Sequence, residues 1–229
     1  MKNMYKSIIV EGPIGVGKTT LATKLSSSLE SMLVLEKYSE NPFLEKFYKD
    51  VGKFNKYTKT SKHALSTQLF FLLQRADDFK SKEYLALKNH NIISDYFIDK
   101  DKLFAKAILS TDEYLLYNKV YDALNLDIEK PSLVIYLQTN AETLMSRIKK
   151  RGLWYETNIT EAYLKKIIDS YTLFFHSYKE SPLLIINTSN VNVNDPHDYA
   201  MLLEQINKDI KGKIYLNPLS QWETDACLK

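Results

Sequence analysis

Residues 12–19 of the chain, GPIGVGKT, match the pattern GxxxxGK[ST], in which a glycine-rich turn leads into a lysine and a hydroxyl residue. A short apolar run at 7–10 precedes this motif, and a segment with leucines at helical spacing, 19–29, follows it. A glycine-rich turn between a strand and a helix directs backbone N–H groups and the positive end of the helix dipole towards a phosphate group. The motif therefore favours an α/β fold and predicts a nucleotide phosphate site.

Each part of this phosphate loop has a chemical role. The lysine, Lys18, reaches the β- and γ-phosphates of the nucleotide, and the hydroxyl of Thr19 is a ligand for Mg²⁺. A structural turn that happens to contain Lys-Thr is the alternative, and the strand and helix on either side argue against it. The predicted ATP-binding residues of the loop are Gly12, Pro13, Ile14, Gly15, Val16, Gly17, Lys18, Thr19 and Thr20.

The rest of the chain alternates between strand-like and helix-like segments. Short apolar runs, typical of parallel strands covered on both faces, occupy 7–10, 92–94, 133–137 and 183–187, and 32–35 is a weaker fifth. Segments with helical spacing occupy 19–29, 65–79, 141–150 and 160–178, the last opening with the capping pair Thr160 and Glu161. This alternation predicts a five-stranded parallel sheet flanked by helices, with a ligand crevice at the carboxyl ends of the strands.

Composition limits the classes of function. The chain has 229 residues and no Gly/Ser-rich or Pro-rich linker, so we expect a single domain over 1–229. Its formal charge of +3 is too small to indicate a nucleic-acid-binding surface or a polybasic membrane anchor. No run of apolar residues is long enough for a membrane helix, and the single cysteine, Cys227, excludes a disulfide framework and a Cys-based zinc site. We expect a cytoplasmic protein that binds neither nucleic acid nor membranes.

A phosphate loop does not by itself identify the acceptor of the phosphate. The NKxD motif with which GTPases read guanine does not occur, and the short run that ends in Asp95 only partly resembles the metal-binding strand of transport ATPases. Glu36 follows the second predicted strand, where a carboxylate can accept a proton from an attacking hydroxyl, or could equally cap the next helix. The layout as a whole is as small as that of the nucleotide and nucleoside kinases.

Five blocks follow the phosphate loop in order: ENPFLEKFYKD, TQLFFLLQR, SDYFIDKDKLFA, LVIYL and RIKKRG. Together with the loop, and over roughly residues 7–187, they resemble the bacterial deoxynucleoside kinases, especially the deoxyadenosine/deoxyguanosine kinase group. The resemblance implies a P-loop kinase fold and transfer of the γ-phosphate of ATP, with Mg²⁺, to the 5′-hydroxyl of a deoxynucleoside in nucleotide salvage. It also implies a preference for purine deoxynucleosides and a homodimer.

The resemblance further implies roles for individual residues. Glu36 would contact the 5′-hydroxyl as a candidate general base, and Tyr48 and Glu156 would hold the 3′-hydroxyl. The acceptor's base would be read by Gln68, Arg75 and Asp101. Asp95 would be the other candidate for proton acceptor, or a metal contact together with Thr19, and Lys18 would act in catalysis. Arg147 and Arg151 would hold the donor phosphates, in a lid at about 147–157.

Some of these assignments leave alternatives. Tyr96 stands where the family has an arginine after the acidic residue, so that role is vacant or filled by another cation such as Lys37 or Lys100. Leu153 replaces a third lid arginine, and the base-reading aspartate could be Asp99 instead of Asp101. Arg147 and Arg151, followed by Gly152, also fit an ordinary helix C-terminus.

Two other functions stay open at this level. One is a thymidylate-type nucleoside monophosphate kinase, and the other is a regulatory protein that binds ATP without transferring phosphate. The C-terminal segment 213–229 shows no readable pattern. Several aromatic residues are expected in the core and not in the site: Phe70, Phe71, Phe79, Phe104, Phe174 and Phe175.

Overall fold

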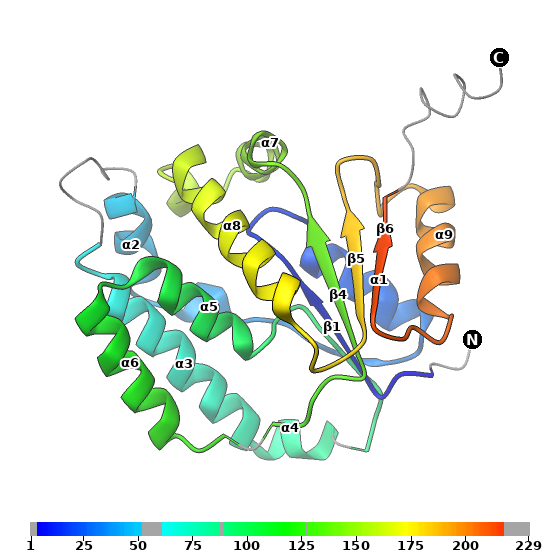
Figure 1. Cartoon of the computed structure of the whole chain (residues 1–229), viewed down its shortest axis with the longest axis horizontal. Helices are drawn as coiled ribbons and strands as arrows, with labels where there is room; N and C mark the ends of the chain where they lie inside the picture. Colours follow the sequence, from blue (N-terminus) through cyan, green and yellow to red (C-terminus); the bar gives the residue numbers. More distant parts are fainter. Residues whose placement is uncertain (1–3, 52–60, 88, 127, 218–229) are drawn as a thin grey trace.

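The computed structural model describes residues 4–51, 61–87, 89–126 and 128–217 of the chain (Figure 1). Its centre is one parallel sheet of six strands in the order β2-β3-β1-β4-β5-β6. The strands are β1 (Ser7–Glu11), β2 (Met32–Val34), β3 (Ile92–Ser94), β4 (Leu133–Gln138), β5 (Leu183–Asn187) and β6 (Lys213–Leu216). The parallel sheet and its five predicted strands are confirmed.

The predicted number of strands is wrong by one, because β6 adds an edge strand at the start of segment 213–229. Its four residues, KIYL, are partly or largely exposed, and Tyr215 is 65% exposed. An edge strand with one neighbour does not need the continuous apolar run of a strand covered on both faces, so sequence pattern gives it little signal. The remainder of that segment, 218–229, with Cys227, lies outside the described residues.

Strand β1 lies in the middle of the sheet and positions the phosphate loop. Its residue Ile8 pairs with Ile93 of β3 on one side and Leu133 of β4 on the other, and all three side chains are fully buried. The chain turns to opposite sides of β1 as it builds β2 and β4. The loop after β1 therefore lies at the switch point of strand order, where open α/β sheets bind their ligands.

Nine α-helices lie within the described residues, together with 3₁₀ turns at Tyr38–Glu40 and Trp154–Glu156. Four of them, α1 (Lys18–Ser28), α3 (Ala64–Lys80), α7 (Ala141–Arg151) and α8 (Glu161–Ser177), match the predicted segments closely. The apolar spacing of the sequence does not predict the other five, which are α2 (Leu44–Val51), α4 (Lys82–Leu87), α5 (Asp99–Ile108), α6 (Thr111–Ala123) and α9 (Pro196–Ile206). None of the described helices combines the length and apolar character of a membrane span.

Capping residues define the helices that frame the site. The hydroxyl of Thr160 accepts a hydrogen bond from the backbone N–H of Tyr163 at the start of α8, as its sequence position predicts. Helix α7 begins after Asn140, whose side chain caps it, and ends at Gly152, which has a φ of 70°. That left-handed conformation suits glycine and stops the helix directly after Arg151.

The helices cover the sheet unevenly. Helix α8 crosses one face of the sheet and α1 the other, while α2, α3, α5 and α6 form a group beside it (Figure 1). Helix α9 lies beside the β6 edge, where the hydroxyls of Tyr199 and Ser28 are 2.8 Å apart. The carboxyl ends of β1, β2 and β3 thus face the helix group and the loops that join it to the sheet.

Candidate active site

The phosphate loop joins β1 to α1. Its first glycine, Gly12, has a φ of 151°, and a Cβ there would lie 2.3 Å from the carbonyl oxygen of Leu137. The ammonium of Lys18 turns back into the loop and donates to the carbonyl oxygens of Gly12 at 2.8 Å and Pro13 at 3.2 Å. Burial, with a smaller effect from the charge of Lys100, lowers the pKa of Lys18 to about 8. The loop therefore places a cation at the start of α1, where a phosphate is expected to bind.

Asp95 follows β3 and connects the phosphate loop to the end of β2. One of its carboxylate oxygens accepts a hydrogen bond from the hydroxyl of Thr19 at 2.5 Å, and the other accepts from the backbone N–H of Glu36 at 2.8 Å. The hydroxyl and the carboxylate are hard oxygen groups of the kind that Mg²⁺ prefers. The two predicted metal ligands are thus adjacent, although they come from positions 76 residues apart.

Glu36, after β2, is held by two cations from different helices. Arg75 of α3 donates to one carboxylate oxygen, and Lys100 of α5 donates to the other at 2.7 Å. Burial raises the pKa of Glu36, but the charges of Lys100 and Arg75 outweigh burial and lower it to about 2. The carboxylate is consequently ionised, and its alternative use as a helix cap is not found.

Arg75 also binds Asp101, so the guanidinium joins two carboxylates. The Arg75 and Asp101 side chains are 5% and 2% exposed, and burial raises the pKa of Asp101 to about 6 against the opposing charge of Arg75. Within the described part of the chain, Nε of Arg75 and Oδ2 of Asp101 have no hydrogen-bond partner. Asp99, the alternative aspartate, lines a different cavity.

One cavity, called here the central cavity, brings most of the predicted residues together. It lies between the phosphate loop, α3, α5 and the 3₁₀ turn Trp154–Glu156. Gln68 and Arg75 reach it from one face of α3, as their spacing of seven residues predicts. The predicted residues that line it are Ile14, Gly15, Lys18, Thr19, Glu36, Tyr48, Gln68, Arg75, Asp95, Asp101, Arg151 and Glu156.

A second cavity, the outer cavity, lies on the other side of the phosphate loop. Its walls are residues 15–20, Arg147, Arg151, residues 188–194 and Asp198. Lys18 and Thr19 line both cavities. A phosphate chain bound in the loop could therefore face one ligand in the central cavity and another in the outer cavity. Residues 188–194 were not anticipated from the sequence, which has no motif there.

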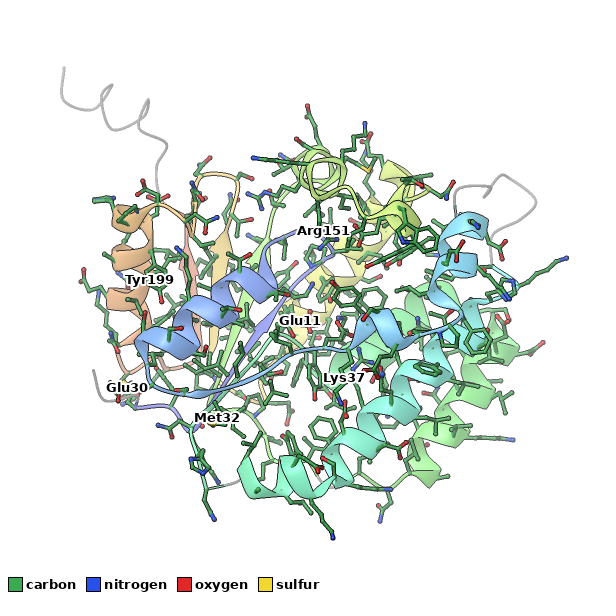
Figure 2. The ribbon with its side chains drawn as sticks, turned by 180° about the vertical axis from the view of Figure 1, so that it is seen from behind. Glu11, Glu30, Met32, Lys37, Arg151 and Tyr199 are labelled. Carbon is green, nitrogen blue, oxygen red and sulfur yellow. The ribbon has the colours of Figure 1, made fainter. Side chains whose placement is uncertain are left out.

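The two arginines of α7 differ in their contacts. Arg151 forms an ion pair with the buried carboxylate of Glu156, with N–O distances of 2.6 and 2.7 Å, and lines both cavities. In Figure 2 it lies at the upper edge of the sheet, near the loop that leads into α1. Arg147 instead donates to the backbone carbonyl oxygens of Val16 and Thr188, and it lines only the outer cavity. Its contact with donor phosphates remains a prediction.

Tyr96 occupies the position after Asp95 at which an arginine is expected. The structure shows which other cation lies beside Glu36. Lys37 points away to Asp78 of α3, at 2.6 Å, and its side chain is half exposed (Figure 2). Lys100 contacts Glu36 directly. The ring of Tyr96 lies 5.7 Å from the guanidinium of Arg75, so it packs against the site without adding a charge.

Two aromatic residues expected only in the core take part in the site. Phe71 and Phe104 line the central cavity, and both are partly buried. The charged groups Arg75 and Lys100 lie over their rings, at 5.1 and 5.7 Å. Helical spacing cannot separate a cavity-lining phenylalanine from a core one, so no sequence signal identifies them.

Comparison with known proteins places these features in context. The family model described as "Deoxynucleoside kinase" matches residues 8–211 of the chain. Deoxyguanosine kinase of Bacillus subtilis is 33% identical over 195 residues, covering 84% of this chain and 90% of that protein. Deoxyadenosine kinase of Lactobacillus acidophilus is 27% identical over 223 residues, covering 91% and 98%. Deoxyadenosine kinase from M. mycoides, solved with the products dCMP and a flexible dCDP bound, matches at a TM-score of 0.73 and 26% identity, over 88% of this chain and 98% of that chain.

Proposed function

Because the chain belongs to the deoxynucleoside kinase family, we propose that it phosphorylates a purine deoxynucleoside bound in the central cavity, with the base against Gln68, Arg75 and Asp101. Its reaction is that of an ATP-dependent deoxynucleoside kinase. The names of its relatives favour this reaction over the thymidylate-type monophosphate kinase and the non-catalytic ATP-binding protein. The purine preference is supported by the deoxyguanosine and deoxyadenosine kinases among them.

The observation that carries the proposed acceptor site is the unsatisfied pair on the cavity wall. Arg75 has a buried donor, Nε, and Asp101 a buried acceptor, Oδ2, each without a partner among the described residues. Buried polar groups are costly to leave unpaired, so they favour a ligand that supplies an acceptor and a donor close together. Guanine offers the acceptors O6 and N7 beside a ring N–H, and adenine offers N7 beside its amine. Gln68 can pair with either base and orients it.

The same cavity has groups suited to the sugar. The Tyr48 hydroxyl and the Glu156 carboxylate line the cavity together with Glu36. We place the 3′-hydroxyl between Tyr48 and Glu156 and the 5′-hydroxyl at Glu36. Fixing the sugar at both ends directs the 5′-oxygen at the phosphate loop and removes much of the entropic barrier to reaction.

The proposed step is an in-line transfer. The 5′-oxygen of the deoxynucleoside forms a bond to the γ-phosphorus of ATP, the bond from that phosphorus to the β–γ bridging oxygen breaks, and ADP leaves with the electron pair. The proton of the 5′-hydroxyl passes to Glu36. Lys18 neutralises charge on the β- and γ-phosphates, and Arg151, which lines both cavities, closes over the reacting groups.

We assign the Mg²⁺ site to Thr19 and Asp95. The hydrogen bond from the Thr19 hydroxyl to the Asp95 carboxylate supports this assignment, because it brings two oxygen ligands together. Mg²⁺ held there would supply positive charge against the charge that develops on the phosphates during transfer. The other carboxylate oxygen of Asp95 accepts a hydrogen bond from the backbone N–H of Glu36. This bond fixes the segment that carries the proposed general base.

We also propose a homodimer that associates through α3 and α6, which pack against each other. These helices expose Leu73, Leu115 and Leu116 by 46–57%. Exposed leucines on two helices that pack together are typical of an interaction surface. Light scattering of the purified protein tests this directly, because a monomeric mass, or a dimer unaffected by Leu115→Glu with Leu116→Glu, would contradict it.

A coupled ATP-consumption screen tests the proposed acceptor. The four deoxynucleosides, their 5′-monophosphates and the matched ribonucleosides are each supplied as the only acceptor. We expect the highest kcat/KM with deoxyguanosine or deoxyadenosine and the lowest among deoxynucleosides with thymidine. A higher kcat/KM for thymidine than for both purines would refute the assignment of the base site.

A further inference from the structure

Lys100 is a buried cation that none of the assignments above uses. It lies in the first turn of α5, between Asp99 and Asp101, and its side chain is 12% exposed. Among the described residues, its ammonium makes one hydrogen bond, to Oε2 of Glu36 at 2.7 Å. The ammonium lies over the ring of Phe104, 5.7 Å from its centroid. Lys100 also lines the central cavity.

The two partners of Glu36 are not equivalent. The guanidinium of Arg75 donates to both Glu36 and Asp101. Its position therefore depends on Asp101, which is proposed to contact the nucleobase. Lys100 donates a hydrogen bond, among the described residues, to Glu36 only, at the carboxylate oxygen that Arg75 does not hold. One anchor would leave the carboxylate free to rotate about its last side-chain bond, whereas two anchors on different oxygens fix its plane.

Burial acts against the charge of this lysine. Taking a charge out of water costs several kcal/mol, and well-packed apolar residues often replace a buried ion pair without loss of stability. The ammonium also lies close enough to Lys18 to lower the pKa of that residue, so two like charges are kept near each other at the cavity wall. The charge of Glu36 nonetheless outweighs burial and raises the pKa of Lys100, so a charged ammonium lies beside the proposed general base.

We propose that Lys100 is a positioning residue for phosphoryl transfer, which orients the carboxylate of Glu36 towards the acceptor 5′-hydroxyl. This inference rests on the proposed function, because it takes Glu36 as the group that receives the hydroxyl proton. Orientation matters here because an error of about 1 Å in the placement of a reacting group can cost about a hundredfold in rate. Lys100 thus supplies, from the first turn of α5, the cation that position 96 lacks.

The test compares Lys100→Met, Lys100→Arg and the control Lys37→Met, each assayed with the deoxynucleoside that the unmodified protein prefers. Methionine keeps an unbranched side chain and removes the charge. Lys37 is the other cation near Glu36 in the sequence, but it binds Asp78 at the surface. We expect Lys100→Met to lower kcat by about tenfold or more, by analogy with loss of one group that stabilises a transition state. The KM for the deoxynucleoside should stay within about threefold, because Lys100 acts after binding.

Two rescues separate positioning from a structural role. Lys100→Arg should recover most of kcat, because its guanidinium can donate to Oε2 of Glu36. In Lys100→Ala, methylammonium or ethylammonium in the buffer should raise kcat with a saturable dependence, whereas sodium at equal ionic strength should not. If Lys100→Met lowers Tm, Lys100→Gln is assayed in its place. We expect the kcat of Lys100→Gln to lie between those of Lys100→Ala and Lys100→Arg.

Several results would overturn the inference. They are a kcat for Lys100→Met close to that of the unmodified protein, an equal loss in Lys37→Met, a loss that appears only in KM, or no recovery with either arginine or added amines. These outcomes are distinct from failure of the proposed function, which appears in the unmodified protein as a lack of turnover with purine deoxynucleosides. A fully active protein with an unaffected Lys100→Met variant would refute only the role of Lys100.

Discussion

Replacing Glu36 with glutamine removes the charge of the proposed base while keeping its shape. The structure predicts two separate losses. The amide cannot accept the proton of the 5′-hydroxyl, and it cannot neutralise Arg75 and Lys100, which both donate to the carboxylate. The first loss affects turnover and the second affects folding, so one variant tests both the chemistry and the electrostatics of the central cavity.

The size of the folding effect follows from the pKa of Glu36. Its pKa falls from 4.5 to about 2, and each unit corresponds to about 1.4 kcal/mol, so the ionised carboxylate contributes about 3 kcal/mol. Because the pKa is lowered, this contribution is fully present above pH 4.5 and is lost as the pH falls through 2. We expect Glu36→Gln to lower the free energy of unfolding at pH 7 by about 3 kcal/mol and kcat by about a hundredfold or more, with little change in KM.

The first assay is urea unfolding at pH 7, and the second is steady-state kinetics at a protein concentration and temperature where the variant is folded. Asp95→Asn is the matched control, since it also replaces a carboxylate that lines the central cavity beside the phosphate loop. A Glu36→Gln variant as stable as the unmodified protein would refute the electrostatic argument. A large loss of kcat in Asp95→Asn with little in Glu36→Gln would transfer the role of base to Asp95.

Other substitutions test the remaining parts of the site. Lys18→Ala should abolish transfer while the protein stays folded, and turnover within a few-fold of the unmodified protein would show that the phosphate loop is not the donor site. Asp101→Ala should raise relative thymidine turnover and lower purine turnover, whereas an equal loss for all bases would point to Asp99 or to a structural role. The KM for the purine deoxynucleoside should rise as the pH falls through about 6, where Asp101 takes up a proton, and Asp101→Asn should remove that dependence. Gly12→Ala should lower the free energy of unfolding by about 2 kcal/mol or more, because a Cβ would clash with Leu137. The control Gly212→Ala, whose Cβ would meet no atom within 4 Å, should cost less.

The sequence predicts the centre of the fold well because the centre obeys simple rules. Strands β1, β4 and β5 are continuous apolar runs, and α1 and α3 have one apolar face each. Edge and surface elements do not follow those rules. Strand β6 has one neighbour and mixed polarity, and α6 buries only Tyr117 fully, although its capping box of Ser110 and Glu113 marks its start. That capping box is a readable signal that the apolar pattern alone does not reveal.

Sequence predicts the site residues whose positions are set by a local motif. It does not predict those whose positions are set only by tertiary packing. Gln68 and Arg75 share a helix face, so their spacing brings them into one cavity. The choice of Lys100 over Lys37 depends on the direction of α5 relative to the end of β2, which no local pattern encodes. The same holds for Asp101 over Asp99, since two residues along a helix turn a side chain by about 200°, and the two side chains line different cavities.

The low pKa of Glu36 bears on how it can serve as a base. A carboxylate with a pKa of about 2 is a weak proton acceptor towards a free hydroxyl, and general bases work best with a pKa near the working pH. In a loose transition state, however, little bond to the attacking oxygen has formed when the old bond breaks. The hydroxyl becomes acidic only as its oxygen binds phosphorus, so the proton leaves late and needs a nearby acceptor more than a strong one. On this argument the two cations that weaken Glu36 as a base also give the site what the reaction requires, an ionised carboxylate held in one orientation.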